Sequence, residues 1–175
     1  MERLEQRMYG LVPYNISPIQ AGIQFGHAVV EYGLKNFHNQ VYLNWAKYDK
    51  TFIILNGGTT NTNVEKLGTL NTHLSTLKNN DVNVSEFYEP DLGDQLTAVV
   101  FLVDERVYNK EKYPDFNDYL KQFPDIISTF EDMRFSDIIR HMETVKPTVY
   151  RDWVASIGGE ENLFLRNFLR NFKLA

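Results

Sequence analysis

Three polar side chains with helical spacing near the start of the chain could carry chemistry. Gln20, Gln24 and His27 are separated by four and three residues, so they share one face of a helix. An imidazole such as that of His27 can give or take a proton, while Gln24 could orient that ring or a substrate carbonyl. We therefore predict a site for proton transfer or polar ligand binding. The alternative is a histidine hydrogen-bonded inside the core.

A second polar group precedes an apolar segment near the middle of the chain. Asp91 and Asp94 lie in a predicted turn, and Thr97 enters the strand predicted over 96–103. A carboxylate at Asp91, if it lies beside the histidine, could polarise a water molecule. Aspartate in such a turn also caps backbone amides. Both interpretations of Asp91 stay open from the residues alone.

A polar loop follows another apolar segment. Residues 56–61, Asn-Gly-Gly-Thr-Thr-Asn, connect a strand predicted over 51–55 to a helix predicted over 62–78. Backbone amides and hydroxyls just before a helix suit an anion or ribose hydroxyls, with Asn56 and Gly57 as candidate ligand-binding residues. The loop lacks the spacing of a phosphate-binding Walker loop. Its alternative role is a simple connection between two elements.

These segments resemble the second class of peptidyl-tRNA hydrolases, the archaeal and eukaryotic type. The likeness covers roughly residues 8–104 and includes Gln24-Phe25-Gly26-His27-Ala28, Trp45, Lys50 to Leu55, Asp91-Leu92-Gly93-Asp94 and Thr97-Ala98-Val99-Val100. The resemblance implies an ester hydrolase that cleaves peptide from tRNA. It also implies that His27 and Asp91 handle protons and that Gln24 belongs to the catalytic set.

The chain departs from that family at two charged positions. The family has a lysine four residues before the glutamine of the histidine motif, whereas this chain has Gln20. The family also has a basic residue after its Asp-x-Gly, whereas this chain has Asp94. Two positive charges expected near a polyanionic substrate are thus missing, and charge stabilisation is often the largest catalytic contribution. Gln20 and Asp94 then fit better with Asn56, Gly57 and Thr97 as a ligand-binding set.

The order of predicted elements indicates an α/β fold. We expect a three-layer α/β/α sandwich with a small mixed four-stranded sheet and a C-terminal helical extension. Residues 1–104 form the α/β domain, and residues 105–175 form an extension that packs on the domain or on a second copy. The predicted strands are 9–13, 51–55, 82–88 and 96–103; the predicted helices are 17–37, 41–48, 62–78, 113–123, 125–144 and 160–173.

Composition narrows the classes of partner. The 175 residues carry a net charge of −5, and residues 1–104 hold 7 Lys and Arg against 11 Asp and Glu, without the basic cluster typical of nucleic-acid binding. The chain has no cysteine, and its histidines lack partners at ligand spacing, so we expect no metal and no cofactor. It also lacks an apolar run long enough to cross a membrane, which leads us to expect a cytoplasmic protein without a membrane partner.

Three functions remain open. The leading hypothesis is a catalytically divergent hydrolase-like protein that binds or sequesters a small nucleotide- or ribose-like ligand. The second is an active peptidyl-tRNA hydrolase. The third is an assembly module that forms a homo-oligomer through its C-terminal helices, with Phe168 and Phe172 as contacts. A small divergent copy with its own tail is compatible with a viral or mobile-element gene.

Overall fold

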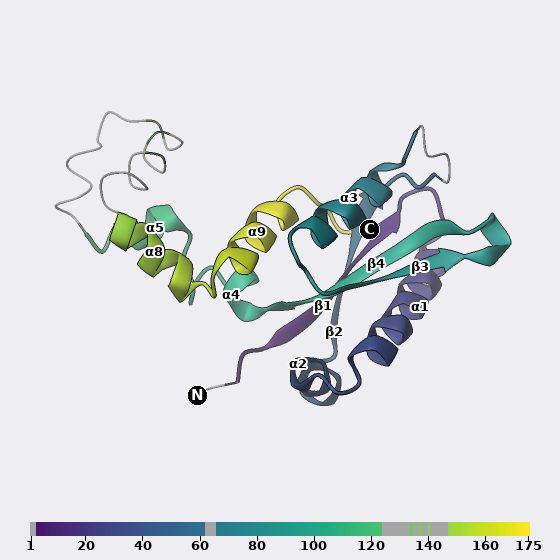
Figure 1. The fold of residues 1–175 in the computed structure, drawn as a ribbon, viewed down its shortest axis with the longest axis horizontal. Helices are drawn as coiled ribbons and strands as arrows, with labels where there is room; N and C mark the ends of the chain where they lie inside the picture. Colours follow the sequence, from purple (N-terminus) through teal and green to yellow (C-terminus); the bar gives the residue numbers. More distant parts are fainter. Residues whose placement is uncertain (1–2, 62–65, 124–133, 135–136, 138–139, 141–146) are drawn as a thin grey trace. The chain divides into compact units, whose positions relative to one another are not determined.

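The computed structural model describes residues 3–61, 66–123, 134, 137, 140 and 147–175 (Figure 1). The chain divides into two compact units. The first comprises residues 1–105 together with 167–175, and the second comprises residues 106–166. The candidate site lies in the first unit, so that unit is described first.

The first unit is built on a mixed four-stranded sheet with strand order β2-β1-β4-β3. β1 (Gln6–Pro13) pairs in parallel with β2 (Thr51–Gly58) and antiparallel with β4 (Gln95–Asp104). β3 (Val84–Glu89) pairs antiparallel with β4. The parallel pair requires a crossover. The chain provides it with α1 (Pro18–Asn36), α2 (Gln40–Asn44) and a π-helical turn, Trp45–Asp49.

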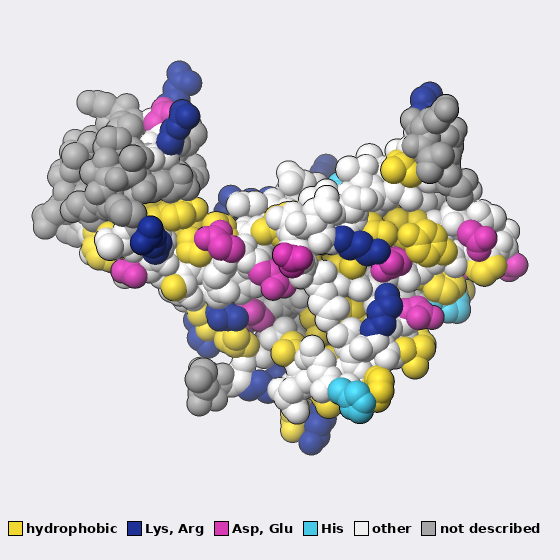
Figure 2. Space-filling view, viewed as in Figure 1, with side chains coloured by type: hydrophobic (Ala, Val, Ile, Leu, Met, Phe, Trp, Pro, Cys, Tyr) yellow, Lys and Arg dark blue, Asp and Glu magenta, His cyan; other side chains and the backbone are white. Residues whose placement is uncertain are grey.

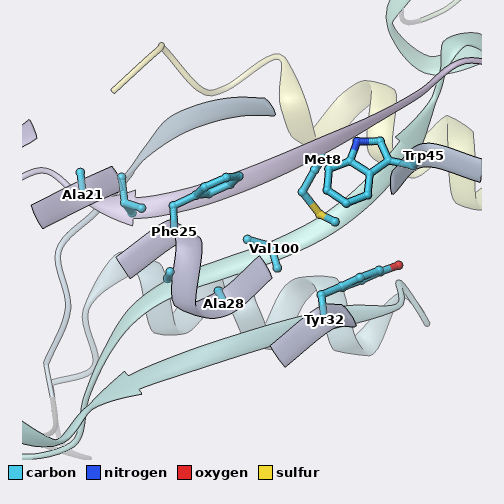
Figure 3. Close-up of a cluster of buried hydrophobic side chains, with 9 residues drawn as sticks. Met8, Ala21, Phe25, Ala28, Tyr32, Trp45 and Val100 are labelled. Carbon is cyan, nitrogen blue, oxygen red and sulfur yellow. The ribbon is translucent and has the colours of Figure 1, made fainter. Parts of the chain in front are cut away.

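The start of α1 follows directly from local sequence. Ser17 caps the helix and Pro18 occupies its first turn, a pair of residues that favours a helix start. The inner face of α1 packs on one face of the sheet, where Phe25 lies over Gly10. Figure 3 shows Phe25, Ala28 and Tyr32 from α1 in one cluster with Met8, Val100 and Trp45.

The other face of the sheet is covered by α3 (Thr69–Asn79) and the last residues of the chain. Leu70, Leu74 and Leu77 of α3 are buried. Phe168 packs against Phe101 of β4, with ring centroids 6.4 Å apart. With helices on both faces, the first unit is the three-layer α/β/α sandwich that the sequence predicts.

The structure corrects the start of the helix predicted over 62–78 and the end of the helix predicted over 160–173. α3 begins at Thr69, not at residue 62, because Gly68 has extended backbone and caps the helix; Leu67 lies outside it and is 52% exposed. Residues 62–65 lie outside the described part. α9 (Glu160–Leu169) ends before residue 173, because the final residues pair with β2: the amide of Asn56 donates to the carbonyl of Lys173 at 2.9 Å.

The second unit is helical in its described part. It contains most of α4 (Glu105–Tyr108), α5 (Phe116–Leu120), α8 (Pro147–Ser156) and the first part of α9. Phe116, Trp153 and Ile157 are buried in one cluster. The predicted helix 113–123 is shorter than expected, and the one predicted over 125–144 lies almost wholly outside the described residues. No helix in the described part is long and apolar enough to span a membrane.

Candidate functional site

Gln24 is a buried link between α1 and the β3–β4 hairpin. Its side-chain nitrogen donates to Oε2 of Glu89 at 2.6 Å, and its side-chain oxygen accepts from the hydroxyl of Thr97 at 2.7 Å. Gln24 is 8% exposed and Thr97 is 1% exposed. Both polar atoms of the Gln24 side chain are thus hydrogen-bonded within the protein, and they connect α1 to β3 and β4.

His27 lies one turn further along α1 and is exposed. Its ring stacks on Phe87 of β3, with centroids 4.6 Å apart and planes 20° apart. Within the described part of the chain, the structure records no hydrogen bond or ion pair to His27. The histidine is therefore exposed on an aromatic ring and is not the hydrogen-bonded core residue of the alternative interpretation.

Asp91 and Asp94 lie on an exposed turn between β3 and β4. The turn begins as a short 3₁₀ helix, Pro90–Leu92, in which the amide of Asp91 faces Oε1 of Glu89 at 3.4 Å. Gly93 and Asp94 follow with φ values of 67° and 57°, the left-handed region that glycine and aspartate tolerate best. Neither aspartate has a hydrogen bond to His27 among the described residues.

Gln20 has a structural partner at the start of α1. The amide of Ser17 donates to its side-chain oxygen at 3.1 Å, and the amide of Gln20 faces the Ser17 hydroxyl at 3.3 Å. This reciprocal pair is a capping box. The residue at the position of the family's lysine therefore stabilises the helix end.

Asn56 and Gly57 lie apart from the histidine, on the edge strand β2. Oδ1 of Asn56 accepts from the amide of Gly58 at 2.9 Å. Gly57 is packed against Leu70 and Leu11, where a Cβ would lie 2.7 and 3.0 Å from their side-chain atoms. Gly57 is thus a packing residue.

The predicted anion site at the end of this loop is not formed. The first amides of α3 point to Thr59: Leu70 donates to its carbonyl at 2.9 Å, and Thr69 faces its hydroxyl at 3.2 Å. The carbonyl and hydroxyl of Thr59 thus bind the two amides that an anion at the start of α3 would use.

A pocket of about 380 Å³ lies between the first turns of α1 and the carboxyl ends of β1 and β2. Asn56 is the one predicted site residue among those that line it. The remaining lining is apolar except for Tyr14 and the backbone, and comprises Val12, Pro13, Ile16, Pro18, Ala21, Gly22, Ile54, Leu174 and Ala175. A second hollow of about 280 Å³ shares Gly22 and Ile54 with the pocket and reaches Val29 along α1.

The tertiary structure therefore separates the predicted residues into two places. Gln24, His27, Thr97 and the acidic turn lie on the β3–β4 side of α1, whereas Asn56 lies in the pocket on the β2 side. Sequence analysis missed Glu89, because its partner Gln24 is 65 positions away. No group of three or more His, Asp or Glu residues within the described ranges is arranged to hold a metal ion.

Comparison with known proteins adds no relative: no protein-family model matches the chain, and no curated protein matches it.

Proposed function

We propose that this chain is a binding protein on a scaffold like that of the second class of peptidyl-tRNA hydrolases, and that it holds a small nucleotide- or ribose-like ligand in the pocket between α1 and β2. The position of that pocket carries the proposal. It lies at the carboxyl ends of two parallel strands, next to the start of the helix that follows β1. Open α/β sheets bind their ligands at this kind of edge.

The lining of the pocket suits a flat, polar molecule. Its volume of about 380 Å³ falls in the usual range of small-molecule sites, roughly 300–1,000 Å³. Apolar side chains such as Val12 and Ile54 offer flat contact to a base. Because Oδ1 of Asn56 is engaged by Gly58, the side-chain nitrogen is the group that remains to donate to a base or ribose oxygen. The positive end of the α1 dipole favours an electronegative atom at the same place.

The charge around the pocket favours a small ligand over tRNA. The residues that line the pocket include no Lys, Arg, Asp or Glu. Over the sheet and its helices in Figure 2, the visible basic side chains are separated by neutral and acidic ones. A long polyanion needs several phosphate contacts at once. Neither the described lining of the pocket nor the face seen in Figure 2 supplies them in one patch.

The ligand is sought by isothermal titration calorimetry with a panel of ribose, nucleosides and nucleoside monophosphates. The decisive variant is Gly22→Leu, because a Cβ at Gly22 meets no atom within 4 Å and the larger side chain extends into both hollows. Gly22→Ala is the matched control, since it has the same backbone effect and adds only a methyl group. We expect binding to the original chain and to Gly22→Ala, with loss in Gly22→Leu. Absence of binding across the panel, or equal affinity in all three proteins, would refute the proposal.

Peptidyl-tRNA hydrolysis is the second candidate, and the exposure of His27 favours it. The ring of His27 stacks on Phe87 and is otherwise exposed, so a substrate could reach it. The test is cleavage of peptidyl-tRNA by the purified chain beside His27→Ala. We expect equal, background rates. Turnover that disappears in His27→Ala would replace the binding proposal with the hydrolase.

A further inference from the structure

α1 carries two apolar stripes on opposite sides. One stripe packs on the sheet, and the other is exposed. Ala21, Phe25, Ala28 and Tyr32 face the core and are buried. A separate outer stripe comprises Ile19, Ile23, Val30, Leu34 and, at the C-cap, Phe37, which are 77, 51, 62, 64 and 58% exposed. A helix that is apolar all round is normally buried. The outer stripe therefore lacks its covering element in the described part of a single copy.

The spacing of the outer stripe is that of a helix packing on another helix. Together with Gly26, its members follow one another in steps of four, three, four, four and three residues. Such steps keep side chains on one line along a helix and allow them to interdigitate with a facing helix. The covering element expected from this pattern is thus a helix with an apolar stripe of its own.

The stripe also carries no charge. The two charged residues of α1 are Glu31 and Lys35, and Lys35 lies toward β3, where its Nζ is 3.7 Å from Glu86. Depletion of charge at the centre and a high apolar content are typical of homodimer interfaces. A nucleic acid or an anionic lipid surface would require basic residues, which this stripe does not have.

We propose that two copies of this chain form a dimer in which the outer stripe of α1 packs against the same stripe of the second copy. Fourteen large apolar residues are exposed in the described part of the chain, and none of them lies on α3, α8 or α9. Among the longer helices in the described part of the chain, α1 is therefore the one with an exposed apolar stripe, and α1 of a second copy can cover it.

The stripe is complementary to itself in antiparallel orientation. If Gly26 lies near the two-fold axis, Val30 of one copy faces Gly22 of the other, and Ile23 faces Val29. Val30 then lies against a residue without a side chain, and Ile23 and Val29 meet as two apolar residues. Because the axis is two-fold, each pair occurs twice, as in an isologous interface. A Cβ at Gly22 or at Gly26 meets no atom within 4 Å, so both positions are open to a partner.

The apolar area is close to what a stable dimer needs. Half-exposed aliphatic and aromatic side chains each present on the order of 100 Å², so the five members of the stripe present roughly 550 Å². Val41 and Leu43 of α2, which follow directly, are 46 and 41% exposed. The stripe alone comes close to the ~600 Å² that each partner buries at the lower end of stable interfaces.

The test is the mass of the full chain in solution, measured by sedimentation over a range of concentrations. We expect a dimer, and we expect Val30→Lys and Leu34→Lys each to raise its dissociation constant by roughly a hundredfold, since each places like charges against one another. Both side chains are exposed, so folding should be unaffected. Leu67→Lys is the matched control, because Leu67 is also exposed and lies off α1; it should leave the dimer intact.

A covalent test uses the absence of cysteine from the chain. Gly26→Cys should oxidise to a linked dimer at least roughly tenfold faster than Leu67→Cys, because pairing raises the effective concentration of the two thiols. A monomeric chain, a dimer that both lysine variants leave intact, or equal oxidation at the two positions would overturn the proposal.

Discussion

The hydroxyl of Thr97 donates to the side-chain oxygen of Gln24 at 2.7 Å, although the two residues are 73 positions apart. Both are buried, so neither can exchange this partner for water. The nitrogen of Gln24 is also engaged, by Glu89. Gln24 thus joins α1 to the hairpin formed by β3 and β4. To orient a substrate instead, it would first have to give up these bonds.

Thr97→Val should lower the free energy of unfolding by about 1–3 kcal/mol, because it leaves the buried oxygen of Gln24 without a donor. Urea denaturation measures this loss. Thr97→Ser retains the hydroxyl and should lose clearly less. An equal loss in Thr97→Ser would contradict this prediction, because it would show that the methyl group of Thr97 stabilises this part of the sheet as much as its hydrogen bond does.

Substitutions at Gln20 should change stability in opposite directions. Gln20→Glu keeps the capping box with Ser17 and adds a negative charge at the positive end of α1, so it should stabilise by about 0.3–1 kcal/mol. Gln20→Lys restores the family's lysine but removes the acceptor of the cap, and should destabilise by a similar amount. Thermal unfolding at low salt tests both, and an increase with Gln20→Lys would contradict the cap as the role of this residue.

Acid should weaken the contact between α3 and the C-terminal residues. Burial lowers the pKa of His73, whose ring lies 4.8 Å from that of Phe172 and 5.8 Å from that of Phe168. Burial favours the neutral ring of His73 in the folded protein. The stabilisation that this ring provides is therefore fully present above about pH 6.5, the ordinary pKa of histidine in an unfolded chain, and is lost as the pH falls from there through the lowered pKa of the folded protein.

The measurement is the free energy of unfolding at about pH 7.5 and about pH 5.5, on either side of the ordinary histidine pKa. His73→Phe should reduce the difference between the two values, since it removes the titrating group and keeps an apolar ring. His38→Phe is the control, because His38 is exposed. An unchanged difference in His73→Phe would show that another group causes the acid sensitivity.

Arg166 should be necessary for the stability of the second unit. Its side chain is 1% exposed, and it donates to the carbonyls of Arg106, Tyr113 and Pro114 and to the carboxylate of Asp115. Arg166→Met removes a buried donor that these acceptors share, at a cost of about 3 kcal/mol or more. Trp153 still donates to the carbonyl of Pro114, and Lys110 still donates to Asp115. Hydrogen exchange should then rise in residues 106–123 and 147–166. The exposed Arg151→Met should not produce that rise.

Local patterns in the sequence determined the order of strands and helices in the first unit and the start of α1, but they did not indicate α8. Alternating or continuous apolar residues indicate strands, and Ser17 followed by Pro18 indicates a helix start, because caps and propensities depend on neighbours along the chain. The same patterns were insufficient at the start of α3. Leu67 continues the helical spacing, but Gly68 and the contacts between Thr59 and Thr69 begin the helix later.

Only the tertiary structure decided how the polar residues are grouped. Gln20, Gln24 and His27 share a spacing, yet one caps a helix, one is buried in hydrogen bonds and one is exposed on an aromatic ring. Glu89 and Asn56 acquire their places through contacts with residues distant in sequence. Such contacts depend on the positions of whole elements, which no spacing within a single segment can reveal.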